Sequence, residues 1–90
     1  MIERRVTVVG CGHVGLVTAA GLAHLGHRVI GLDVDAALVE QLNRSVSPFV
    51  EEGLDDLLVE GSQSGRLRFT RSWPMRWWHP RSTRRAWQRR

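Results

Sequence analysis

The 90-residue sequence predicts an α/β fold in which a partial, doubly wound parallel sheet of about three strands is covered by helices and followed by an irregular C-terminal tail. Two observations favour this fold. Short β-branched runs alternate with segments whose apolar residues recur at helical spacing, in the order strand, helix, strand, helix, helix, strand. A glycine-rich turn also joins the first strand to the first helix, as in parallel sheets with right-handed crossovers.

The first helix lies between two strands. The runs RVTVVG at residues 5–10 and RVIGLD at residues 28–33 each predict a strand that is buried on both faces. Between them we expect a helix from about His13 to Leu25, and Gly26 suits the left-handed position that ends it. The apolar residues at helical spacing are Val14, Val17, Ala20, Leu22 and Leu25.

Two further helices and a short strand follow. Asp35 is expected to cap a helix over residues 36–43, with Leu38, Val39 and Leu42 on one face. The residues SVSPF end this helix, and an amphipathic helix is expected over residues 54–61. The turn residues GSQSG then lead to a third strand, RLRFT, at residues 66–70.

Charge divides the chain near residue 70. Residues 1–70 hold 6 Arg and 9 acidic residues, whereas residues 71–90 hold 7 Arg, all 4 Trp and no acidic residue. We interpret this tail as disordered and do not expect a nucleic-acid partner. The alternative is a module that neutralises phosphates with arginine and stacks bases on tryptophan. The chain has one cysteine, no signal-peptide core and no run of about 18 apolar residues, which favours a cytoplasmic protein without membrane association.

The motif GCGHVG points to a dinucleotide. Gly10, Gly12 and Gly15 follow the G-x-G-x-x-G pattern of Rossmann-type folds, directly after a predicted strand and at the start of a helix. Gly10 would allow the tight turn, Gly12 would let the backbone approach a pyrophosphate, and Gly15 would let helix and strand pack closely. The helix N-terminus would then present free N–H groups to the phosphates.

Asp33 ends the second strand about 20 residues after the motif, where an acid accepts hydrogen bonds from ribose hydroxyls. A carboxylate there repels a 2′-phosphate, so the cofactor expected is NAD rather than NADP. The alternative interpretations are a simple tight turn for the glycines and a strand-end residue for the acid. The candidate cofactor-binding residues are Gly10, Cys11, Gly12, His13, Val14, Gly15 and Asp33, and the cysteine is expected to face the phosphates.

The first seventy residues resemble the N-terminal, NAD-binding part of the UDP-glucose/GDP-mannose dehydrogenase family, and most of all its UDP-glucose-oxidising members. The matching blocks are VVGCGHVGLVTAAGLAHLGHRVIGLDVD, LNRSVSPFVEEGLDDLL and SGRLRFT, and the second is the most specific to this family. His13 stands where the family usually has Tyr, and Leu38 replaces a common Lys or Arg, which weakens the expected grip on NAD. Glu51 matches the family's glutamate, whereas Glu52 stands at its proline position.

The resemblance implies an NAD-dependent oxidation of a UDP-sugar, in which the C6 alcohol of UDP-glucose becomes the carboxylate of UDP-glucuronate. In the family, the catalytic cysteine, lysine, asparagine and aspartate lie far beyond residue 90. We therefore expect no catalytic residue here, no metal site, and a UDP-sugar partner only in the full-length family. The alternative is a fragment of a related β-hydroxyacid or 3-hydroxyacyl-CoA dehydrogenase.

The resemblance stops near residue 70, which divides the chain into an NAD-binding part at residues 1–70 and an Arg/Trp-rich tail at residues 71–90. Family members continue with a helix and a strand that pairs with the first strand. We expect a change of reading frame near residue 70 to account for the difference. The first strand should then lie at a sheet edge, in a marginally stable or partly unfolded chain.

Overall fold

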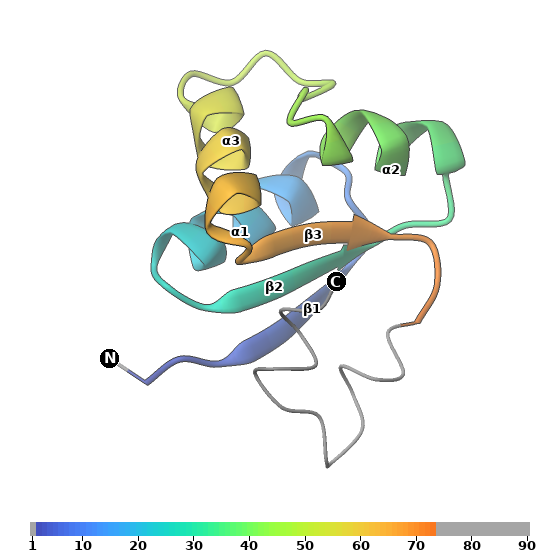
Figure 1. Ribbon diagram of the computed structural model, residues 1–90. Helices are drawn as coiled ribbons and strands as arrows, with labels where there is room; N and C mark the ends of the chain where they lie inside the picture. Colours follow the sequence, from blue (N-terminus) through green and yellow to red (C-terminus); the bar gives the residue numbers. More distant parts are fainter. Residues whose placement is uncertain (1, 74–90) are drawn as a thin grey trace.

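A computed structural model describes residues 2–73 of the chain (Figure 1). Its elements follow the predicted order. They are β1 (Arg5–Val9), α1 (His13–His24), β2 (Arg28–Leu32), α2 (Ala36–Asn43), α3 (Leu54–Ser64) and β3 (Leu67–Thr70). The irregular tail expected at residues 71–90 lies, beyond residue 73, outside this description.

The three strands form one parallel sheet in the order β1-β2-β3. In its register, Val29 of β2 lies between Val6 of β1 and Leu67 of β3. The three helices all lie on one face of this sheet (Figure 1). The predicted α/β fold with a three-stranded, Rossmann-type sheet is therefore confirmed for the described residues.

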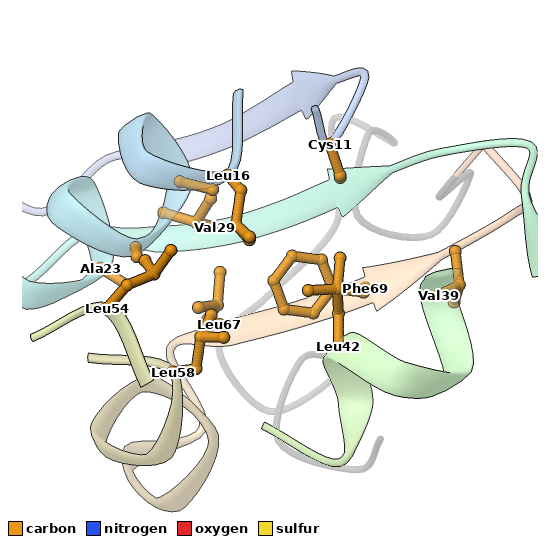
Figure 2. Close-up of a cluster of buried hydrophobic side chains, with 12 residues drawn as sticks. Cys11, Leu16, Ala23, Val29, Val39, Leu42, Leu54, Leu58, Leu67 and Phe69 are labelled. Atoms are coloured by element: carbon orange, nitrogen blue, oxygen red, sulfur yellow. The ribbon is translucent and has the colours of Figure 1, made fainter. Parts of the chain in front are cut away.

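The core fills the space between these helices and the sheet (Figure 2). Each fully buried aliphatic side chain there contributes about 1.5–3 kcal/mol to folding. Its buried members come from every helix and from strands β2 and β3, and Val6 and Val8 of β1 pack against them, so the core connects all elements of the fold. The largest fully buried side chains are those of Leu16, Leu42, Leu58, Val29 and Cys11.

The two predicted buried strands differ in the structure. Residues 28–31 of β2 are buried, as predicted for a central strand. In contrast, β1 is only partly buried and Val9 is 71% exposed, so its prediction as a strand buried on both faces is wrong. The strand ends the order β1-β2-β3, which agrees with the expectation that it lies at a sheet edge.

The face of α1 that enters the core is not the one that the apolar spacing indicated. Val14 is 80% and Leu25 is 55% exposed, whereas the buried residues are Leu16, Ala19, Ala20 and Ala23. Only Ala20 belongs to both sets. Almost every position of this helix is apolar or small, so spacing alone selects no single face. The alanines face the core because small side chains let α1 approach the sheet closely.

Helix α3 is longer than predicted, because Gly61 lies inside it and does not end it. A Cβ atom at this glycine would lie 2.6 Å from the Cβ of Leu67, so the glycine lets α3 pack directly on β3. The helix instead ends at Gly65, whose φ of +74° is the left-handed conformation of a helix C-terminus. Of the predicted turn GSQSG, residues 61–64 are helical.

Candidate functional site

The turn between β1 and α1 has the tight geometry predicted for Gly10. This residue has a φ of +89°, which disfavours any side chain, and its N–H donates to the Leu32 carbonyl at 2.7 Å. The bond joins the ends of β1 and β2. The turn thus lies at the carboxyl ends of these parallel strands, the edge at which ligands bind in open α/β sheets.

Gly15 brings α1 against this turn. A Cβ atom at Gly15 would lie 1.9 Å from the carbonyl oxygen of Gly10, a distance that no backbone adjustment of a few tenths of an ångström removes. The predicted close approach of helix and strand is therefore present. Glycine at this position is a requirement of the fold itself, with or without a ligand.

Gly12 differs from Gly15 because the protein fills no space around it. Apart from Gly12 itself and its two chain neighbours, no protein atom lies within 4 Å of the position that its Cβ would take. It is the N-cap residue of α1, has extended backbone angles, and makes no side-chain capping bond. The first N–H groups of α1 are thus left without a side-chain cap, beside an opening that a side chain would fill.

Asp33 binds this turn through two backbone hydrogen bonds. Its Oδ2 accepts from the N–H of Cys11 at 2.9 Å, and its Oδ1 accepts from the N–H of Asp35 at 2.9 Å. These bonds, with that from Cys11 the strongest influence, hold the pKa of the Asp33 carboxyl below its usual value. The carboxylate is therefore charged at neutral pH. Each of its oxygens keeps a lone pair that can accept a further hydrogen bond.

The side chain of Cys11 lies in the core, so the expectation that this residue would face the phosphates is wrong for its thiol (Figure 2). The cysteine is fully buried, and burial, with a smaller contribution from Asp33, raises its pKa to about 11. A thiol that stays neutral is a poor nucleophile. Its backbone N–H nevertheless belongs to the turn, through the bond to Asp33.

His13 and Val14 begin α1 and point away from the core. The Nε2 atom of His13 lies 3.0 Å from Oε2 of Glu51, and its ring centroid lies 5.1 Å from that of Phe49. Val14 is largely exposed. The motif did not indicate Glu51 and Phe49 as neighbours of the turn, although both belong to the block that resembles the family most specifically.

The predicted site residues therefore come together at one edge of the sheet. Gly10 to Gly15 form the turn and the start of α1, and Asp33 joins them through Cys11. Asp35 caps α2 as predicted, because its Oδ1 accepts from the N–H of Leu38 at 3.1 Å. Leu38 itself packs against the core.

No role for Asn43 was predicted from the sequence, and the structure places this residue beside β3. Its Nδ2 donates to the Phe69 carbonyl at 2.9 Å, and its Oδ1 accepts the Phe69 N–H at 3.1 Å. The amide thus joins the end of α2 to β3. The only signal in the sequence was that Asn43 opens the family-specific block.

The part of the chain that the structure describes contains neither a candidate metal site nor a candidate membrane-spanning helix. Among residues 2–73 no three His, Cys, Asp or Glu side chains are grouped so that they could hold a metal ion. No helix of this part has the length and apolarity needed to cross a membrane.

Nucleotide-sugar dehydrogenases are among the known proteins with similar sequences. GDP-mannose 6-dehydrogenase of Azotobacter vinelandii is 47% identical over 66 residues, which cover 73% of this chain and 15% of that protein. UDP-glucose 6-dehydrogenase YwqF of Bacillus subtilis is 40% identical over 68 residues, which cover 76% of this chain and 16% of that protein. The chain thus spans about 15% of the length of such relatives, and enzymes for both sugar nucleotides match it to a similar degree.

The solved structures that resemble this chain include dehydrogenases of the same two kinds. A UDP-glucose dehydrogenase from Pyrobaculum islandicum has a TM-score of 0.75 and 42% identity, over 79% of this chain and 16% of that one. A ternary complex of GDP-mannose dehydrogenase from Pseudomonas aeruginosa has a TM-score of 0.69 and 42% identity, over 77% and 15% of the two chains.

A sequence model of a whole protein family also matches this chain. Residues 4–79 match the model described as the UDP-glucose/GDP-mannose dehydrogenase family, NAD binding domain. This chain therefore belongs to the UDP-glucose/GDP-mannose dehydrogenase family and carries sequence of its N-terminal, NAD-binding domain.

Proposed function

We propose that the turn at residues 10–15 and Asp33 bind the adenosine diphosphate half of NAD. The observation that carries the proposal is the opening at Gly12, where the uncapped N-terminus of α1 meets space that no protein atom fills. Free N–H groups and the positive end of the helix dipole suit a pyrophosphate. The charged Asp33, bonded to the same turn, suits the ribose hydroxyls.

Each predicted site residue then has a defined part. The backbone of Gly12, His13 and Val14 would face the pyrophosphate, while Gly10 and Gly15 shape the turn. Cys11 would contribute through its backbone, which holds Asp33 in place. The carboxylate of Asp33 would favour NAD over NADP, because it repels a 2′-phosphate.

We further propose that this site serves the oxidation of a nucleotide sugar, with the C6 alcohol of a UDP-sugar as the group that is oxidised. The names of the relatives, which act on UDP-glucose or GDP-mannose, support this substrate class. NAD, when bound, would accept the hydride. The chain has no lysine, and its only cysteine is buried and neutral. Residues 1–90 would therefore bind the cofactor, and they would not supply the catalytic cysteine and lysine. A cytoplasmic location is part of the proposal and is supported by that single free cysteine.

The substitution Gly12→Ser tests the NAD site directly. A serine there meets no protein atom, and it is a better N-cap than glycine, so folding should be unaffected or slightly improved. Its side chain would fill the opening and bond the N–H groups that the pyrophosphate needs. We expect NAD to bind at least about tenfold more weakly, measured by isothermal titration calorimetry on the full chain.

Thermal melting followed by circular dichroism supplies the control for this variant. An unchanged or higher melting temperature shows that the weaker binding does not result from unfolding. Equal NAD affinity of the wild type and Gly12→Ser would exclude the opening at Gly12 as the pyrophosphate site.

A further inference from the structure

His13 carries a side-chain contact that the NAD site as proposed does not require. It is the first residue of α1, and it bonds Glu51, which lies in the connection between α2 and α3. The ring of Phe49, from the same connection, lies beside the imidazole with an angle of 31° between the planes. The connection at residues 44–53 is therefore fixed to the helix N-terminus at the proposed site.

This contact places a carboxylate at the rim of a site that is suited to an anion. The side chains of His13 and Glu51 are 54% and 45% exposed, so both take part in the surface electrostatics of the rim. The carboxylate would repel a bound pyrophosphate at short range. His13 bonds that carboxylate from the first position of α1, and the first turn of the helix contains no acidic residue.

Two other acidic residues lie close to Glu51 in the sequence, namely Glu52 beside it and Asp55 at the start of α3. Asp55 accepts the N–H of Ser47 at 3.0 Å, and no described hydrogen bond joins Glu52 to His13. Phe49 contributes an uncharged ring. Among the described residues, Glu51 is thus the charged group that the structure places in bonding contact with His13.

We propose that His13 and Glu51 form a positioning pair at the rim of the NAD site, in which protonated His13 neutralises Glu51 and so admits the pyrophosphate. The inference rests on the proposed NAD site and adds a regulation of that site by pH. Histidine is the side chain whose charge changes between about pH 5 and 8. NAD binding should therefore be strongest when the imidazole is charged.

Titration of NAD into the full chain between pH 5.5 and 8 tests this pairing. We expect the Kd of the wild type to rise about threefold to tenfold over this range, because the positive charge at the rim is lost. His13→Phe keeps the ring contact with Phe49 but removes both the hydrogen bond and the charge. This variant should bind NAD weakly at every pH, with a flat profile.

Two further variants separate charge from structure. The double variant His13→Phe, Glu51→Gln removes both partners, and its affinity for NAD should recover toward that of the wild type at low pH. His13→Tyr can donate a hydrogen bond to Glu51 but never carries a positive charge, so it should melt at the temperature of the wild type and still show the flat pH profile of His13→Phe.

The chain contains a matched control pair. His24 and Glu60 join α1 to α3 with a distance of 2.9 Å between Nδ1 and Oε1, and their side chains are 57% and 53% exposed. This pair lies at the opposite end of α1 from the site. His24→Phe should therefore leave the NAD affinity and its pH profile unchanged.

The outcomes distinguish this inference from the NAD site itself. A wild type that binds NAD with a pH-independent Kd, or a double variant as weak as His13→Phe, would overturn the positioning pair and leave the site in place. A wild type that binds no NAD at any pH would overturn both the site and the pair.

Discussion

The two ends of the parallel sheet each hold a carboxylate, but one carboxylate is bound by arginine side chains and the other by backbone N–H groups. At the amino end, Glu3 bridges two arginines. Its carboxylate lies 3.0 Å from Nε of the buried Arg28 and 2.9 Å from Nη1 of Arg66. At the carboxyl end, Asp33 bonds backbone N–H groups and no described cationic side chain. The charge of Glu3 is thus paired with arginine side chains, whereas the Asp33 carboxylate has no described cationic partner and lies near the open space at Gly12.

This difference separates a structural end of the small sheet from the end at which we propose that NAD binds. Paired side-chain charges are satisfied without a ligand, so they contribute to folding and leave little to offer a partner. Backbone N–H groups at a helix start cannot be satisfied by their own helix and stay available. Variants at the two ends should therefore separate folding from NAD binding.

The largest effect is expected for Gly15→Ala. A Cβ at this residue would lie 1.9 Å from the Gly10 carbonyl oxygen, so α1 must move away from the turn. We expect a loss of about 3 kcal/mol or more in the free energy of unfolding, enough to abolish a cooperative melt in a small domain. Circular dichroism during heating measures it. A melt equal to that of the wild type would show that the turn is loosely packed.

An intermediate effect is expected for Glu3→Gln at the amino end. Loss of the charge weakens two ion pairs, one of them to an arginine that is only 6% exposed, and should lower the free energy of unfolding by about 2 kcal/mol. Urea denaturation measures the loss. NAD affinity, corrected for the folded fraction, should stay the same, and a change in it would show that the two ends are coupled.

The smallest effect on stability is expected for Asp33→Asn, with the largest change in cofactor preference. An amide cannot accept from both Cys11 and Asp35 as the carboxylate does, so about 1 kcal/mol of stability should be lost. The wild type should prefer NAD over NADP by about tenfold or more, and the variant should narrow this ratio. Calorimetric titration with the two dinucleotides measures the preference, and an unchanged ratio would remove Asp33 from the ribose site.

The lowered pKa of Asp33 also predicts a pH dependence with a defined sign. The folded state holds this carboxyl ionised more strongly than the unfolded state does. The resulting stability is present above the unfolded value of about 3.9 and is lost as pH falls through the folded value. Urea melts between pH 5 and 3 should show a steeper loss for the wild type than for Asp33→Asn.

The sequence predicted the elements and the site to the extent that local signals determine them. The order of helices and strands, the cap at Asp35 and the turn at Gly10 follow from neighbouring residues and were correct. The predicted end of α3 was wrong because Gly61 does not end the helix. It is a glycine because Leu67, a residue of the next strand, packs against it and leaves no space for a Cβ.

The same reason explains what was missed at the site. The burial of the Cys11 thiol and the hydrogen bond from the Cys11 N–H to Asp33 depend on contacts between residues about 20 positions apart. The contact of His13 with Glu51 spans 38 positions. A glycine motif read from the sequence identifies the turn, but it contains no information about which distant side chains meet it.

The amide of Asn43 has a consequence for how this sheet meets other chains. It bonds both the N–H and the carbonyl of Phe69, as a neighbouring strand would, while β2 pairs with the other edge of β3. An intruding strand would have to displace this side chain before it could hydrogen-bond at Phe69. Asn43 therefore hinders the addition of a strand at this position of the β3 edge, an effect that other proteins obtain with charged residues, prolines or bulges.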